Sequence, residues 1–90
     1  MDNNYCVYRH TTPIGKVYIG ITCRKPQERW GVAGNGYKSN KHFYSAIQKY
    51  GWDNFQHEIL FANVTKEFAC KKEQELILHY NSTNPSKGYN

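Results

Sequence analysis

The strings CVY at residues 6–8 and VYIG at residues 17–20 decide the fold of this chain. Both strings are rich in the β-branched and aromatic residues that favour strands. Residues 11–15 between them read TTPIG, and a proline and a glycine in such a short link are typical of a turn. The sequence therefore predicts a β-hairpin that brings two phenols, Tyr8 and Tyr18, close together on one small sheet.

Helix signals follow the hairpin directly. The two hairpin strands are predicted over residues 5–9 and 16–21. Behind Thr22, a proline at the first position suits a short helix over residues 26–30. Three glycines then interrupt the helical pattern, so residues 31–40 are predicted as a loop.

The second helix has the clearest periodicity of the chain. Its apolar residues recur at the spacing i, i+3, i+4 and i+7 that marks one helix face: Phe43, Ala46, Ile47 and Tyr50. Ser39 or Asn40 can cap the start of this helix, and Gly51 can end it. We therefore expect a helix whose apolar face packs on the sheet.

The C-terminal half adds one strand and one helix. Residues 55–61 alternate in character and predict a third strand, with Phe55, His57, Ile59 and Phe61 on one face. Thr65 is a suitable cap for a last helix that runs to about Tyr80, and residues 81–86 form a turn. The predicted order is β-β-α-α-β-α. It indicates an α+β fold, a small antiparallel three-stranded sheet flanked by helices, with residues 1–90 as a single domain.

Composition narrows the class of protein. No apolar run approaches the roughly 20 residues that a membrane span needs, and the polar N-terminus lacks the apolar stretch of a signal peptide. The three cysteines are odd in number and lack C-x-x-C spacing, which argues against a disulfide framework. No pair of cysteines or histidines has zinc-finger spacing, which argues against a zinc site. We expect a cytoplasmic protein with no membrane contact.

The net charge of +5 is concentrated in the middle of the chain. Residues 24–49 carry one acid, Glu28, against six basic residues: Arg24, Lys25, Arg29, Lys38, Lys41 and Lys49. Aromatic residues alternate with these cations, as in many surfaces that bind a phosphate backbone. The basic residues of this segment other than Arg29, together with Lys16, are the candidate nucleic-acid contacts. On charge alone, a plain solvated helix face is an equally good interpretation.

Glu73 is the strongest single indication of a functional site. On the predicted last helix it lies four residues after Ala69, three before Leu76 and four before Ile77, inside the apolar stripe. A carboxylate in such a place is costly unless it is paired or binds a metal. Two structural explanations of Glu73 compete with a functional role. Glu73 can form a salt bridge to Arg29, or it can lie at the edge of the apolar stripe and reach water.

Taken together, these residues resemble the GIY-YIG nuclease family. Residues 6–8 are similar to its first triplet, with cysteine and valine in place of the usual glycine and isoleucine, and residues 18–20 match the second. Arg29 matches the arginine of the family, Glu73 its metal-binding glutamate, and the string GYN that ends with Asn90 its asparagine. The resemblance covers essentially the whole chain.

The resemblance implies hydrolysis of a DNA phosphodiester with one divalent metal ion. Glu73 would hold Mg²⁺ or Mn²⁺, Tyr8 would deprotonate or orient the attacking water, and Tyr18 would hydrogen-bond the phosphate or the water. Arg29 would stabilise charge on the phosphate, and Asn90 would add a hydrogen bond. A tyrosine titrates near 10, so Tyr8 needs nearby positive charge to lower its pKa.

Besides the first triplet, one further position departs from the family. Some members carry a histidine one helical turn after the arginine, where this chain has Ala33. His42, at the start of the predicted second helix, is the candidate to substitute for it, although a plain helix-edge histidine explains it equally well.

DNA, the substrate that the resemblance implies, is consistent with the basic residues of the middle segment. The form of DNA and the biological role stay open. The chain is predicted to act on double-stranded or branched DNA, with no obligate protein partner. A module that binds nucleic acid without cutting it is the competing hypothesis. A stand-alone nuclease, a phage or homing enzyme, and the excised catalytic domain of a larger homing, restriction or repair nuclease are all consistent with the sequence.

Overall fold

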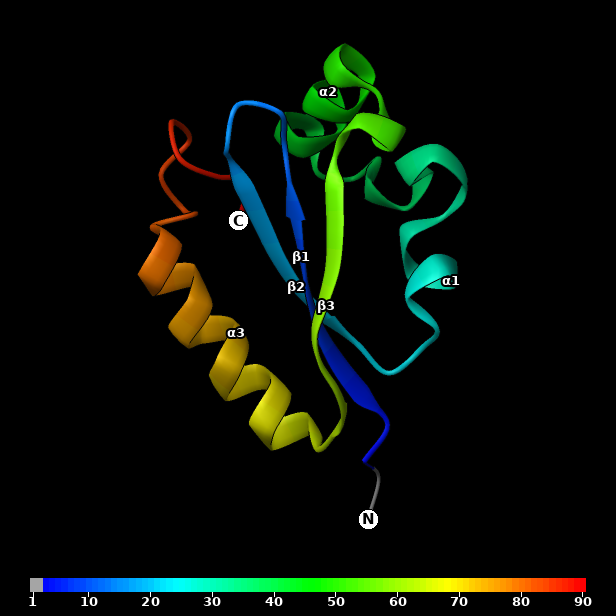
Figure 1. Cartoon of the computed structure of the whole chain (residues 1–90), viewed down its shortest axis with the longest axis vertical. Coiled ribbons are helices and arrows are strands. Elements are labelled where there is room, and N and C mark those ends of the chain that lie inside the picture. The colour runs from blue at the N-terminus through cyan, green and yellow to red at the C-terminus, as the bar shows by residue number, and fades with distance from the viewer. Residues whose placement is uncertain (1–2) are drawn as a thin grey trace.

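The computed structural model describes residues 3–90, and its centre is a three-stranded antiparallel sheet in the order β2-β1-β3. The strands are β1 (Tyr5–Thr11), β2 (Val17–Thr22) and β3 (Gln56–Val64). The predicted hairpin is confirmed, and in its register Tyr8 faces Gly20 while His10 faces Tyr18. The sheet therefore has β2 at one edge and β3 at the other (Figure 1).

Helical elements occupy the positions that the sequence predicts, with two additions. They are α1 (Pro26–Trp30), η1 (Val32–Tyr37), α2 (Lys41–Tyr50), η2 (Trp52–Asn54) and α3 (Lys66–Tyr80), where η marks a 3-10 helix. Asn40 and Thr65 cap α2 and α3 through their side-chain oxygens, which accept from the backbone amides of Phe43 and Phe68. Predicted α+β architecture and element order are both confirmed.

The sequence predicts neither of the two 3-10 helices, η1 and η2, and η1 has an irregular backbone. The predicted loop over residues 31–40 contains η1, in which Ala33 and Gly34 have left-handed backbone angles. At Gly34 a Cβ would lie 2.6 Å from the indole of Trp52, so only glycine lets η1 approach η2 this closely.

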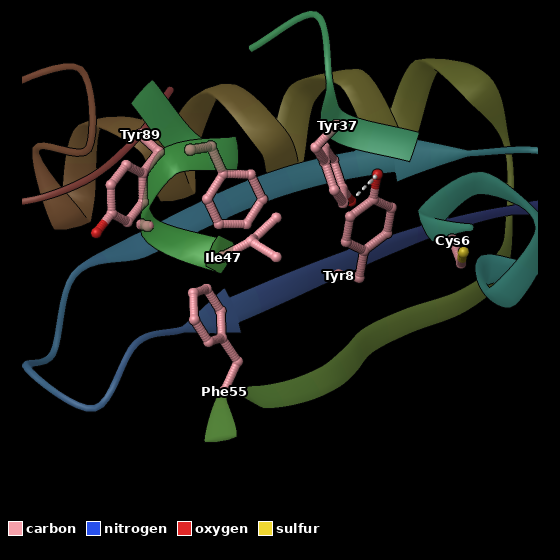
Figure 2. Packing of buried hydrophobic residues seen from close by; sticks show 8 residues of the cluster. Cys6, Tyr8, Tyr37, Ile47, Phe55 and Tyr89 are labelled. Atoms are coloured by element: carbon pink, nitrogen blue, oxygen red, sulfur yellow. Dashed lines mark hydrogen bonds between the residues drawn. The ribbon is translucent and has the colours of Figure 1, made fainter. Parts of the chain in front are cut away.

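The helices cover the two faces of the sheet separately (Figure 1). The α2-side core comprises Cys6, Tyr8, Tyr37, Phe43, Ala46, Ile47, Phe55 and Tyr89. The α3-side core comprises Val7, Ile19 and Ala69, with half-buried residues such as Phe61, Leu76 and Ile77 packed around them. Figure 2 shows members of the α2-side core. Strand alternation explains the division, since Val7 and Tyr8 point to opposite faces.

β3 does not keep the alternation that the sequence predicts. Val7 pairs with Phe61, whereas the next residue, Tyr8, pairs with Ile59, so Leu60 is an extra residue on β3. Such a bulge reverses the facing of every residue beyond it. Phe61 therefore packs on the α3 side while His57 lies on the α2 side, and the prediction that both share one face is wrong.

The C-terminal segment returns to the outer edge of β2. Gly88 forms a parallel bridge with Val17, and the amide of Tyr89 donates to the carbonyl of Val17 at 3.0 Å. Residues 82–90 thereby cover the part of β2 next to Tyr18. Within residues 3–90, none of the helices combines the length and the apolar character that crossing a membrane requires.

Candidate active site

The two phenols of the hairpin lie on the α2 side of the sheet, but at different depths. Tyr8 is only 1% exposed, and its ring lies over Gly20 on the neighbouring strand. A Cβ at Gly20 would meet the Tyr8 hydroxyl at 2.5 Å, so the glycine makes room for this ring. Tyr18 is half-buried and stacks on Phe43 of α2, with the ring centroids 4.7 Å apart. Tyr18 is thus the phenol nearer to solvent.

Burial dominates the acid–base properties of Tyr8. It raises the pKa of Tyr8 to about 12, although the charge of Arg29 acts to lower it. Arg29 therefore acts to lower the pKa of Tyr8, as predicted, but burial raises this pKa by more. At neutral pH the Tyr8 hydroxyl keeps its proton, and it can serve as a base only if it gives up that proton as it accepts another.

Arg29 reaches the phenols from the short helix α1. Its guanidinium lies 4.7 Å from the centre of the Tyr37 ring and donates to the carbonyl of Gly36 at 3.1 Å. These contacts fix a half-buried cation on the α2 side of the sheet. The charge of Arg29 acts to lower the pKa of both Tyr8 and Tyr18.

Glu73 approaches Tyr18 from α3. Burial raises the pKa of Tyr18, the charge of Arg29 lowers it, and the charge of Glu73 raises it further. Arg29 and Glu73 belong to helices on different faces of the sheet, and Tyr18 is on β2, the edge strand. Tyr18 of the edge strand is therefore a phenol on which the charges of a cation and a carboxylate both act.

The carboxylate of Glu73 fits a divalent cation. It is half-buried, and within residues 3–90 it has neither a hydrogen bond nor an ion pair, so the predicted alternative of a salt bridge to Arg29 is not formed. Burial accordingly raises the pKa of Glu73. The described chain holds no cluster of three or more metal-binding side chains. One carboxylate completed by water and phosphate oxygens is a typical setting for Mg²⁺.

Asn90 holds the backbone of β2 directly beside Tyr18. Its side-chain oxygen accepts from the amide of Ile19 at 2.8 Å, and its side-chain nitrogen donates to the carbonyl of Ile19 at 2.7 Å. Ser82, fully buried, donates to the same oxygen at 2.9 Å. Both polar atoms of the Asn90 amide are thus engaged by the fold, which makes Asn90 a residue that positions Tyr18.

His42 lies apart from the phenols of the sheet. It is exposed at the start of α2, and its ring meets Tyr89 edge-on at 4.7 Å. A cavity of about 190 Å³ opens beside it, lined by Ile14, Lys16, His42, Ser45, Ala46, Lys49, Tyr50 and Tyr89. Lys16 and Lys49 are thus brought together. The other predicted nucleic-acid contacts are exposed on the surface: Arg24, Lys25, Lys38 and Lys41.

Sequence reasoning missed three polar residues behind Tyr8. Tyr37, buried at the end of η1, is hydrogen-bonded to Tyr8, and His10 and His57 continue from it across the sheet. An aromatic residue inside a loop rich in glycine and asparagine was the available signal for Tyr37. His10 and His57 had no comparable signal, because their contact depends on the β1–β3 register.

Comparison with known proteins identifies the family of this fold. No curated protein matches the chain, and no solved structure matches it. The family model described as the GIY-YIG catalytic domain matches residues 4–90. The chain therefore belongs to the GIY-YIG family, whose catalytic domain implies nuclease activity on a nucleic-acid substrate.

Proposed function

We propose that this GIY-YIG domain is a metal-dependent DNA endonuclease or nickase. The observation that carries the proposal is that the charges of Arg29 and Glu73 both act on Tyr18 of the edge strand β2, and that the charge of Arg29 also acts on Tyr8. Metal-dependent hydrolysis of a phosphodiester needs a cation that stabilises the phosphate, a group that orients or deprotonates the attacking water, and a ligand for the metal ion. Arg29, the two phenols and Glu73 supply these three kinds of group.

Each residue has a role that follows from its surroundings. Arg29, already fixed by Tyr37 and Gly36, stabilises the charge that builds up on the phosphate. Tyr18 is half-buried and hydrogen-bonds the phosphate or the water. Tyr8 accepts the proton of the attacking water. Asn90 acts from behind the site, where it holds the strand that carries Tyr18.

Glu73 is the residue that would hold Mg²⁺ or Mn²⁺. When bound, such an ion supplies positive charge that neutralises the scissile phosphate and the leaving oxygen. Glu73 is suited to this role because its carboxylate is half-buried and unpaired in the described chain. A carboxylate that the fold had placed for stability alone would be expected to have a partner.

The substrate of the proposed enzyme is DNA, double-stranded or branched. Lys16 and five basic residues of the middle segment supply a surface for its backbone: Arg24, Lys25, Lys38, Lys41 and Lys49. Contacts to the backbone carry little sequence preference, so cleavage with little sequence preference is expected. His42 is proposed to contact the substrate from the cavity beside Lys16 rather than to act on Tyr8. The cytoplasmic location and the single-domain organisation stay predictions from the sequence.

Cleavage of supercoiled plasmid tests the proposal. The wild type is incubated with Mg²⁺, with Mn²⁺ or with EDTA, beside the Glu73→Gln variant and the Glu75→Gln variant. Glu75 is a matched control because it lies on the same helix and is exposed, paired with Lys72 at 3.3 Å. Metal-dependent nicking that Glu73→Gln abolishes and Glu75→Gln retains is the expected result. Binding without cleavage in every metal would favour the non-cutting module.

A further inference from the structure

An unbroken chain of hydrogen bonds runs from Tyr8 to the other edge of the sheet. The hydroxyls of Tyr8 and Tyr37 are 3.3 Å apart, a contact drawn in Figure 2. The Tyr37 hydroxyl lies 2.8 Å from Nε2 of His10, and Nδ1 of His10 lies 2.8 Å from Nδ1 of His57. Nε2 of His57 ends the chain at the carbonyl of Trp52, at 2.9 Å.

The carbonyl of Trp52 fixes the direction of every bond in this chain. A carbonyl only accepts, so Nε2 of His57 carries a hydrogen, and Nδ1 of a neutral His57 is then an acceptor. His10 must therefore donate from Nδ1, which leaves its Nε2 to accept from Tyr37. Because Tyr37 has a single hydrogen, the Tyr8 hydroxyl is the donor in the first bond. With both histidines neutral, Tyr8 directs its own proton into the chain.

We propose that Tyr8, Tyr37, His10 and His57 form a proton relay that lets Tyr8 act as a base, with His57 as the residue that stores the proton. This inference rests on the proposed nuclease function. It assigns roles to Tyr37, His10 and His57 that the two triplets, Arg29 and Glu73 do not provide.

The transfer balances atom by atom. The O–H bond of the attacking water breaks as its proton joins the Tyr8 oxygen, and the original Tyr8 proton passes to Tyr37. The Tyr37 proton passes to Nε2 of His10, and the Nδ1 proton of His10 passes to Nδ1 of His57. Tyr8, Tyr37 and His10 end neutral. His57 ends as an imidazolium that donates from both nitrogens, and the water has become hydroxide.

His57 is suited to hold the proton, whereas His10 is suited to pass it on. His10 is fully buried, and burial, with the charges of His57 and Arg29, lowers its pKa to about 2. It therefore stays neutral at ordinary pH. His57 is half-exposed, so it can return the proton to solvent after each turnover.

Within residues 3–90, no carboxylate is paired with His57. The neighbouring β3 carboxylate, Glu58, is paired with Arg9 at 2.7 Å. His10 and His57 contact each other, and the other groups that face them come from the packed elements. These groups are Tyr8 of β1, Tyr18 of β2, Arg29 and Trp30 of α1, Tyr37 of η1, Phe43 of α2 and Trp52 of η2. The charged member of this set is a cation, Arg29.

The direction of the chain can be measured without any cleavage assay. Long-range ¹H–¹⁵N NMR of the wild type distinguishes the two tautomers of each neutral histidine. The relay requires a hydrogen on Nδ1 of His10 and on Nε2 of His57 when both rings are neutral. A hydrogen on Nε2 of His10 under those conditions would overturn the proposal, because Tyr8 could then no longer donate into the chain.

Kinetics test the relay in the enzyme itself. In His57→Gln the amide can still donate to Trp52 and accept from His10, but it cannot take a proton. We expect plasmid cleavage about 10- to 100-fold slower, with unchanged DNA binding and with a pH–rate profile that differs from that of the wild type. His79→Gln, on the exposed face of α3, is the control and should match the wild type.

Two results would be decisive against the relay or against the function. A His57→Gln variant with the wild-type rate and pH profile would refute the relay while the nuclease function stands. A wild type that cuts no DNA with any metal would refute the proposed function and the catalytic role of the relay with it. Tyr37→Phe, which breaks the chain in its middle, serves as the second variant and should show the same slow rate.

Discussion

Tyr8 and Gly20 face each other across the β1–β2 pair, and the phenol ring of Tyr8 occupies the space that any side chain at position 20 would need. The clash distances for a Cβ at Gly20 are 2.5 Å to both Cζ and the hydroxyl oxygen of Tyr8. A glycine in a strand interior usually weakens the strand, so its presence here is explained by this close approach. The pair brings Tyr8 toward the edge where Arg29 and Glu73 act.

Gly20→Ala is expected to destabilise the fold and to displace Tyr8. An added methyl group in a packed core costs roughly 1–3 kcal/mol, and the rigid ring cannot move aside easily. Thermal unfolding should show a lower Tm, and cleavage should fall together with it. A second substitution that shortens Tyr8, Tyr8→Leu, should restore the Tm of the alanine variant but leave it inactive. A Tm unchanged by Gly20→Ala would mean that the ring does not lie where the structure puts it.

Tyr8→Phe should separate chemistry from packing. The ring stays, while the hydroxyl that meets Tyr37 is lost, and Tyr37 keeps its bond to His10. We expect near-normal stability and a cleavage rate lower by about 10²-fold or more, the usual size of a general-base effect. Single-turnover kinetics at saturating DNA measure this, with Tyr44→Phe as a control outside the hydrogen-bonded chain. A loss below tenfold would assign Tyr8 a structural role.

Glu73→Gln should abolish cleavage without loss of stability. Burial raises the pKa of Glu73, so the folded state binds its proton more readily than the unfolded state does. The stability of the wild type therefore falls as pH rises through the raised pKa, and that of the glutamine variant does not. The Tm of the variant should equal that of the wild type at low pH and exceed it at neutral pH. Added Mg²⁺ should raise the wild-type Tm alone.

Asn90→Asp is a sharper test of the β2 edge than Asn90→Ala. Aspartate keeps the oxygen that accepts from Ile19 and Ser82 but places a second acceptor against the Ile19 carbonyl, where asparagine donates. Both variants should be less stable by about 1–3 kcal/mol, because they leave buried backbone groups unpaired or opposed. Urea unfolding gives the values. Equal stability of Asn90→Asp and the wild type would contradict the position of the Asn90 amide.

Local sequence signals were sufficient for the elements but not for their long-range register. The hairpin, the caps at Asn40 and Thr65 and the end of α2 at Gly51 were predictable because each depends on residues within one turn or one strand. The bulge at Leu60 was not, since only pairing with β1 reveals an extra residue. The His10–His57 contact was hidden for the same reason. Glu73 was found because its place in an apolar stripe is visible along one helix.

The hydrogen bonds between Asn90 and Ile19 join residues 71 positions apart. They also complete the edge of the strand that carries Tyr18, so the proposed site is the last part of the fold that the growing chain can finish. Until residue 90 has left the ribosomal exit tunnel, this edge of the sheet has no partner. The order of the sequence therefore delays completion of the proposed site until all of residues 3–90 have been synthesised.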